Sequence, residues 1–180
     1  MPFTILRQDI TKMDVDAIVN STSAEPSVGG GADRMIHRVA GPDLLIERRR
    51  YGTLKVGQAV LTRGFGLPAK YVIHVLGPLY HDGRQGEHAR LYDTYKQALK
   101  LAKTKQVQSI ALPLIGSGTF AFPRGEALET ALRAIKAFLD EYDMQVYLVV
   151  YDEASYQISL ERFVSVESYL ERHHEIPMVE

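Results

Sequence analysis

The chain is organised around residues 17–38, which read AIVNSTSAEPSVGGGADRMIHR. The first three residues of this stretch are apolar and strand-like, and a polar, turn-rich loop follows them. Gly29, Gly30 and Gly31 come next, and Asp33 is expected to open an amphipathic helix. A strand, a glycine loop and a helix N-terminus in this order bring bare backbone N–H groups and the positive end of a helix dipole to one point. Such a point favours an anion, most often a phosphate, although a flexible surface loop is the alternative that these residues leave open.

A second segment repeats this design later in the chain. Residues 109–115 read SIALPLI, a run typical of a central strand that is buried on both faces. Pro113 is expected near the end of that strand, because it has no N–H to donate to the sheet. A glycine turn at residues 116–119 follows, and then a helix with apolar residues on one face. Two such turns side by side would suit a diphosphate better than a single phosphate.

The remaining segments predict strands that alternate with helices. Strands are expected at residues 3–7, 59–62, 71–76 and 145–150, and helices after Asp43, over the segment with Leu91 and Tyr95, and from about residue 154 to 173. This alternation predicts an α/β layered domain, and the length of 180 residues fits one domain that spans residues 1–180. The run Arg48-Arg49-Arg50 is interpreted as a solvated helix end.

Composition excludes several classes of function. The chain has no cysteine, which rules out a thiol nucleophile, a redox pair and a thiolate zinc site. The net charge of −1 argues against general binding of nucleic acid or of an acidic membrane surface. The six histidines show no metal-ligand spacing, so no metal is expected. Neither a signal peptide nor a membrane span is expected, and the missing cysteines fit a cytoplasmic protein.

Five segments, taken in order, resemble the macro domain family, and most closely its MacroD-like class. They are QDIT (residues 8–11), DAIVNSTS with GGGADRMIHRVAGP (16–23 and 29–42), LPAKYVIHVLGP (67–78), LPLIGSGTFAFP (112–123) and VVYDEASY (149–156). The family forms of the two glycine segments are DAIVNAAN…GGGVDxxIHxxAGP and PxISxGxFGYP. The resemblance implies a three-layer α/β/α fold around a central mixed β-sheet, with ADP-ribose in a cleft at the strand ends.

The resemblance also implies roles for individual residues. Asp9 would accept a hydrogen bond from the adenine amino group, Ile10 would lie beside the adenine, and Tyr151 would stack on it. The amides of residues 116–119 would hold the diphosphate, while Phe120 and Asn20 would contact the distal ribose. The expected ligand-binding residues are Asp9, Ile10, Asn20, Ser23, Gly29, Gly30, Gly31, Ala32, Gly116, Ser117, Gly118, Thr119, Phe120 and Tyr151.

The implied chemistry is hydrolysis at C1″ of the distal ribose. Cleavage there develops positive charge on the sugar, and the attacking water must be aimed. Asp33 matches the catalytic aspartate of the family and would orient that water, with Asn20 on the distal ribose. His37, four residues on and on the same helical face, would position Asp33 or a bound water. The residues alone also allow simpler roles: a turn-capping Asp9, an Asp33 that only complements the helix dipole, and an ordinary helix histidine. The scheme needs no cofactor and no metal.

Three departures from the family pattern bear on the activity. Ser23 replaces the second asparagine of NAAN, Gln8 replaces a glycine, and Ala121-Phe122 replaces Gly-Tyr. The leading hypothesis is an enzyme that hydrolyses ADP-ribosyl esters, either on protein aspartates and glutamates or in O-acetyl-ADP-ribose. Ser23 motivates the alternative, a non-catalytic reader of ADP-ribosyl groups. The arginine run alone suggests a third function, binding of nucleic acid or poly-ADP-ribose.

Overall fold

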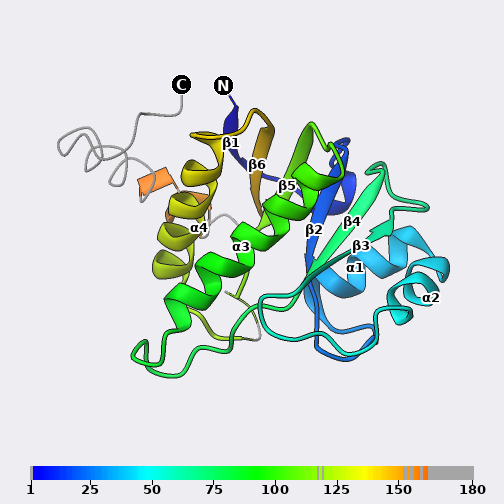
Figure 1. Ribbon diagram of the computed structural model, residues 1–180, viewed down its shortest axis with the longest axis horizontal. Coiled ribbons are helices and arrows are strands. Elements are labelled where there is room, and N and C mark those ends of the chain that lie inside the picture. The colour runs from blue at the N-terminus through cyan, green and yellow to red at the C-terminus, as the bar shows by residue number, and fades with distance from the viewer. Residues whose placement is uncertain are drawn as a thin grey trace.

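A computed structural model describes residues 2–116, 118, 120–151, 154, 156–158 and 160–161. It shows one β-sheet between two layers of helices (Figure 1). In chain order the elements are β1 (Phe3–Arg7), the short 3-10 helix η1 (Ile10–Lys12), β2 (Ala17–Ser21), α1 (Gly31–Ala40), α2 (Asp43–Arg49), β3 (Ala59–Arg63), β4 (Tyr71–Val75), α3 (Glu87–Thr104), β5 (Ser109–Pro113), α4 (Arg124–Leu139) and β6 (Gln145–Val150). The last predicted helix lies mostly outside the described residues. No helix in the described ranges is long and apolar enough to cross a membrane.

The sheet has six strands in the order β1-β6-β5-β2-β4-β3. All neighbouring strands run parallel except β3, which is antiparallel to β4, so the predicted mixed sheet is confirmed. β2 and β5 are direct neighbours, with Ala17 opposite Ile110. Because parallel strands end at the same edge, the two glycine loops that follow β2 and β5 start side by side.

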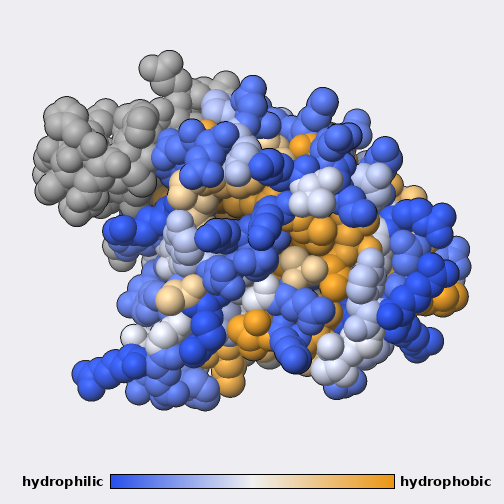
Figure 2. Space-filling model, viewed as in Figure 1, coloured by the Kyte–Doolittle hydropathy of each residue, from blue (hydrophilic) through white to orange (hydrophobic). Residues whose placement is uncertain are grey.

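Alternate residues of each strand face opposite layers of helices, which confirms the α/β/α arrangement. Ala17 and Val19 of β2 pack with residues of α3 and α4, whereas Ile18 packs with Ile36 of α1 and with α2. Figure 1 shows α3 and α4 together over one face of the sheet. Hydrophilic residues cover most of the outer side of these two helices (Figure 2). Asn20 has the same parity as Ile18 and therefore lies on the α1 side of the sheet.

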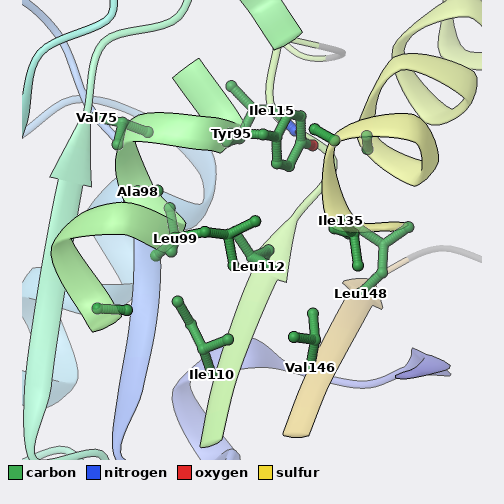
Figure 3. Close-up of a cluster of buried hydrophobic side chains, with 14 of the residues drawn as sticks. Val75, Tyr95, Ala98, Leu99, Ile110, Leu112, Ile115, Ile135, Val146 and Leu148 are labelled. Atoms are coloured by element: carbon green, nitrogen blue, oxygen red, sulfur yellow. The ribbon is translucent and has the colours of Figure 1, made fainter. Parts of the chain in front are cut away.

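The larger part of the core lies between α3, α4 and the strands β5 and β6. Leu99, Leu112 and Leu148 meet there, and Tyr95 of α3 points toward the end of β5 (Figure 3). The Tyr95 hydroxyl donates a hydrogen bond to the Pro113 carbonyl (2.8 Å) and accepts one from the Ile115 N–H (2.7 Å). β5 ends at Pro113 as predicted. Where the second glycine loop begins, the Tyr95 hydroxyl takes the place of the backbone hydrogen bonds between strands.

Two predicted helix starts need small corrections. α1 begins at Gly31, two residues before Asp33, because the Asp33 carboxylate reaches back to the Gly29 N–H (2.7 Å) and stabilises an extra part of the first turn. α2 begins at Asp43 itself, after Pro42, with no side-chain cap. Proline tolerates this position because its missing N–H has no role at a helix start.

The prediction for the arginine run is wrong at its first residue. Arg48 is only 1% exposed. Its guanidinium donates hydrogen bonds to the Gly52 carbonyl (2.7 Å) and the Ala24 carbonyl (3.2 Å). Backbone carbonyls inside the protein therefore compensate this charge, while Arg49 and Arg50 are exposed as predicted. Arg48 is not available to bind a nucleic-acid phosphate.

Candidate functional site

A cleft of about 510 Å³ opens where β1, β5 and β6 end. Its walls are mostly apolar and come from segments far apart in the sequence. It is lined by Gln8, Asp9, Ile10, Gly31, Ala32, Met35, Pro113, Leu114, Val149, Val150 and Tyr151. Five residues predicted to bind a ligand thus meet in one cavity: Asp9, Ile10, Gly31, Ala32 and Tyr151.

Asp9 has a structural role and is also accessible from the cleft. Its Oδ1 accepts hydrogen bonds from the Thr11 N–H (2.9 Å) and the Thr11 hydroxyl (2.7 Å), which caps η1. Its Oδ2 has no hydrogen-bond partner among the described residues, so it is available to a donor from a ligand. Tyr151, directly after β6, is 78% exposed and lines the cleft. A planar base between a carboxylate and an aromatic ring suits this end of the cleft.

A buried polar cluster lies at the start of α1, next to the cleft. We call Asn20, Gly29, Asp33 and His37 the carboxylate cluster. Asp33 Oδ1 accepts a hydrogen bond from Asn20 Nδ2 (2.6 Å) and lies 3.4 Å from His37 Nε2, while Oδ2 accepts from the Gly29 N–H. Asn20, Asp33 and His37 are at most 7% exposed. The cleft and the cluster are contiguous along the chain, because Gly31 and Ala32 line the cleft and Asp33 follows them.

The environment of Asp33 keeps it ionised. Burial alone would raise its pKa, but hydrogen bonds from His37, Asn20 and the Gly29 amide, together with the charge of His37, outweigh burial and lower the pKa below its ordinary value. Gly29 also leaves room for this carboxylate, because a Cβ there would lie 3.0 Å from Asp33 Oδ2 and the carboxylate would have to shift. The site therefore holds a fixed carboxylate that accepts hydrogen bonds, which is the property needed to orient a water.

Sequence reasoning missed the residues beneath this cluster. His74 of β4 is fully buried, and its Nδ1 lies 3.2 Å from Asn20 Nδ2. Its Nε2 lies 2.9 Å from the hydroxyl of Thr62 in β3, which is also fully buried. A histidine in the middle of the apolar run YVIHVL was the available signal, since a buried polar side chain needs a partner. Met35, Leu114 and Val149 of the cleft wall carried no such signal.

The other predicted residues that the structure describes do not line the cleft. Ser23 donates from Oγ to the Glu25 carbonyl (3.2 Å). Phe120 packs on the buried cluster of Leu54, Val60 and Leu76. Gly116 has a φ of +85°, which favours glycine, and Gly118 is exposed, with no atom within 4 Å of the place where a Cβ would lie. Ser117 and Thr119 lie outside the described residues, and Gly30 is exposed as the residue before α1.

Comparison with known proteins identifies the family. The family model described as Macro domain matches residues 19–131, which include both glycine loops and the carboxylate cluster. This chain belongs to the macro domain family. In the described part of this macro domain, no group of three or more metal-ligating side chains is arranged to hold a metal ion.

Two relatives whose names state an activity are similar to most of this macro domain. An O-acetyl-ADP-ribose deacetylase of Escherichia fergusonii is 42% identical over 155 residues, which cover 83% of this chain and 88% of the relative. The human ADP-ribose glycohydrolase MACROD2 is 38% identical over 184 residues, which cover 98% of this chain and 43% of the relative. The solved structure of the Oceanobacillus iheyensis macrodomain with ADP superimposes with a TM-score of 0.88 at 32% identity, covering 93% of this chain and 92% of that chain.

Proposed function

We propose that this macro domain binds ADP-ribose in its cleft and hydrolyses ADP-ribosyl esters. The substrates are O-acetyl-ADP-ribose or proteins that carry ADP-ribose on aspartate or glutamate. One observation carries the proposal: a cleft suited to a nucleotide leads, within one helical turn, to a buried carboxylate whose pKa is lowered. The names of the Escherichia fergusonii and human relatives, and the ADP in the Oceanobacillus iheyensis structure, support the same ligand.

The proposed binding mode uses both ends of the site. Adenine lies between Tyr151 and Ile10, and its amino group donates to Asp9 Oδ2. The diphosphate lies between the two glycine loops, where the amides of residues 116–119 and the N-terminus of α1 provide donors. The distal ribose then reaches Asn20 and Phe120 and comes close to the carboxylate cluster.

The proposed reaction needs one aimed water and one carboxylate. Breaking the bond between C1″ and the ester oxygen develops positive charge on the ribose, and the released carboxylate carries the negative charge away. Asp33 accepts a hydrogen bond from the attacking water, directs its oxygen at C1″, and takes the proton that the water loses as the new C–O bond forms, before passing it to solvent. Asn20, His37 and the Gly29 amide keep Asp33 in place, so little reorganisation is needed when the water attacks.

The test is release of ADP-ribose from an auto-ADP-ribosylated protein. We expect Asp33→Ala to lower turnover about 100-fold or more, a typical contribution of a positioned acid–base group. Asp43→Ala is the matched control, because Asp43 also lies in the first turn of a helix but is exposed. Equal release by the wild type and Asp33→Ala would refute the role of Asp33.

A reader that binds without turnover is the second candidate, and Ser23 is the observation that favours it. A serine reaches less far than the asparagine common in the family, and its hydroxyl is engaged with the Glu25 carbonyl. Calorimetry that shows tight binding of ADP-ribose, together with no turnover, would select the reader. In that case we expect Ser23→Asn to introduce turnover; if turnover is already present in the wild type, the reader is rejected.

A further inference from the structure

We propose that His74 is a positioning residue that fixes the side-chain amide of Asn20 and thereby lets the site distinguish ADP-ribose from ADP. The proposal rests on the proposed function, because it assigns Asn20 to the distal ribose, which ADP lacks. It concerns two strands, β3 and β4, that contribute no residue to the walls of the cleft.

The first step concerns which atom of the amide faces Asp33. Asp33 Oδ1 lies 2.6 Å from one terminal atom of Asn20. The ionised carboxylate only accepts hydrogen bonds, so that atom must be the donor, Nδ2. The opposite orientation would place two oxygens in contact at this distance, with no hydrogen between them.

The second step determines the tautomer of His74. The same Nδ2 lies 3.2 Å from His74 Nδ1, so Nδ1 must be the unprotonated nitrogen that accepts its second hydrogen. The ring proton is then on Nε2, which donates to Thr62 Oγ1 at 2.9 Å. Burial, followed by the charges of Arg48 and His37, outweighs the opposing charge of Asp33 and lowers the pKa of His74 to about 3, so the ring is neutral at neutral pH.

The third step concerns the atom that remains. Both hydrogens of the Asn20 amide are used, and Asn20 Oδ1 is buried without a hydrogen-bond partner among the described residues. A buried acceptor without a donor is unfavourable. The contacts of Nδ2 with Asp33 and His74 therefore stabilise this orientation of the amide, since Oδ1 gains no hydrogen bond from it. In the proposed binding mode, a hydroxyl of the distal ribose supplies this missing donor. Asp33 and His74 together therefore determine that the site offers an acceptor, and not a donor, to this sugar, and His74 does so by accepting the second amide hydrogen.

Two substitutions of His74 separate this role from simple packing. In His74→Asn, the side-chain oxygen replaces Nδ1 and can still accept from Asn20. In His74→Gln, the terminal amide replaces Nε2, so the contact to Thr62 is kept and the acceptor for Asn20 is lost. Affinities for ADP and ADP-ribose are measured by calorimetry for the wild type and both variants.

We expect His74→Gln to bind ADP-ribose about 10-fold more weakly than the wild type and to bind ADP unchanged, whereas His74→Asn keeps both affinities. The proposal is overturned if His74→Gln keeps the wild-type preference for ADP-ribose, if both variants lose it equally, or if ADP binding falls in parallel. A wild type that binds neither ligand would instead refute the proposed function. Nitrogen-15 NMR of the wild type provides a test without a variant, since a proton on Nδ1 of His74 would exclude the geometry.

Discussion

Lowering the pH from 7 to 5 should destabilise this protein through one buried side chain, His74. The pKa of a histidine in the unfolded chain is near its ordinary value of 6.5, whereas in the folded protein it is about 3. Between these two values the unfolded chain binds a proton that the folded protein does not bind. Stability is therefore highest above pH 6.5 and falls as the pH decreases toward 3.

The size of the effect follows from the two pKa values. A difference of one pKa unit corresponds to about 1.4 kcal/mol of free energy. Between pH 7 and pH 5, most of the stability is lost over the roughly 1.5 pH units below 6.5, where the unfolded chain is protonated at this histidine and the folded protein is not. The titration of His74 should thus remove about 2 kcal/mol of the free energy of unfolding between pH 7 and pH 5. Asp33, whose pKa is lowered, also favours the folded state at higher pH, but it is present in both proteins compared below.

The measurement is urea unfolding of the wild type and His74→Asn at pH 7 and pH 5. Each protein gives its own difference between the two pH values, so a change in overall stability caused by the substitution cancels. We expect the difference to be about 2 kcal/mol smaller in His74→Asn than in the wild type. The same difference in both proteins would refute the reasoning, because it would mean that His74 takes up its proton without unfolding.

Three further predictions concern the scaffold and are all tested by urea unfolding at pH 7. Arg48→Met removes a buried cation from its carbonyl partners and should lower the free energy of unfolding by about 2–4 kcal/mol. Arg49→Met, the same change at an exposed neighbour, should alter it by no more than about 0.5 kcal/mol. Equal effects would show that the burial of Arg48 does not matter for stability. Ala121 has a φ of +59°, a backbone conformation that is strained for a residue with a Cβ. Ala121→Gly should therefore raise the free energy of unfolding by about 0.5–1 kcal/mol. A loss of stability would show that the backbone at Ala121 is not strained. Tyr95→Phe leaves the Ile115 N–H without its acceptor and should cost about 1–3 kcal/mol; an unchanged protein would show that this hydroxyl does not secure the end of β5.

The parts of the site that follow a local pattern could be predicted from the sequence. A strand, glycines and a helix in close succession are sufficient to locate each loop, and the apolar run before Gly116 indicated a central strand. The contact between Asp33 and His37 follows from a spacing of four residues in a helix. The resemblance to macro domains added the roles of Asp9 and Tyr151, which the structure brings to one cleft.

The parts that depend on distant backbone groups could not be predicted. Arg48 is buried because carbonyls of Ala24 and Gly52 accept from it, and a backbone carbonyl leaves no signature in the side-chain sequence. His74 and Thr62 meet only because β3 and β4 pair in one register, and a shift of one strand by one residue would put the two side chains on opposite faces of the sheet. The early start of α1 depends on a hydrogen bond from Asp33 back to Gly29, which the spacing permits but does not require.

The pairing of β1 with β6 determines when the adenine end of the cleft can form during synthesis. Phe3 lies opposite Val146, so the first strand has no partner until nearly 150 residues have been translated. Asn20, Asp33 and His74, in contrast, are all made in the first half of the chain. A ribosome-bound nascent chain that stops before β6 should therefore already carry the residues of the carboxylate cluster but be unable to hold a nucleotide.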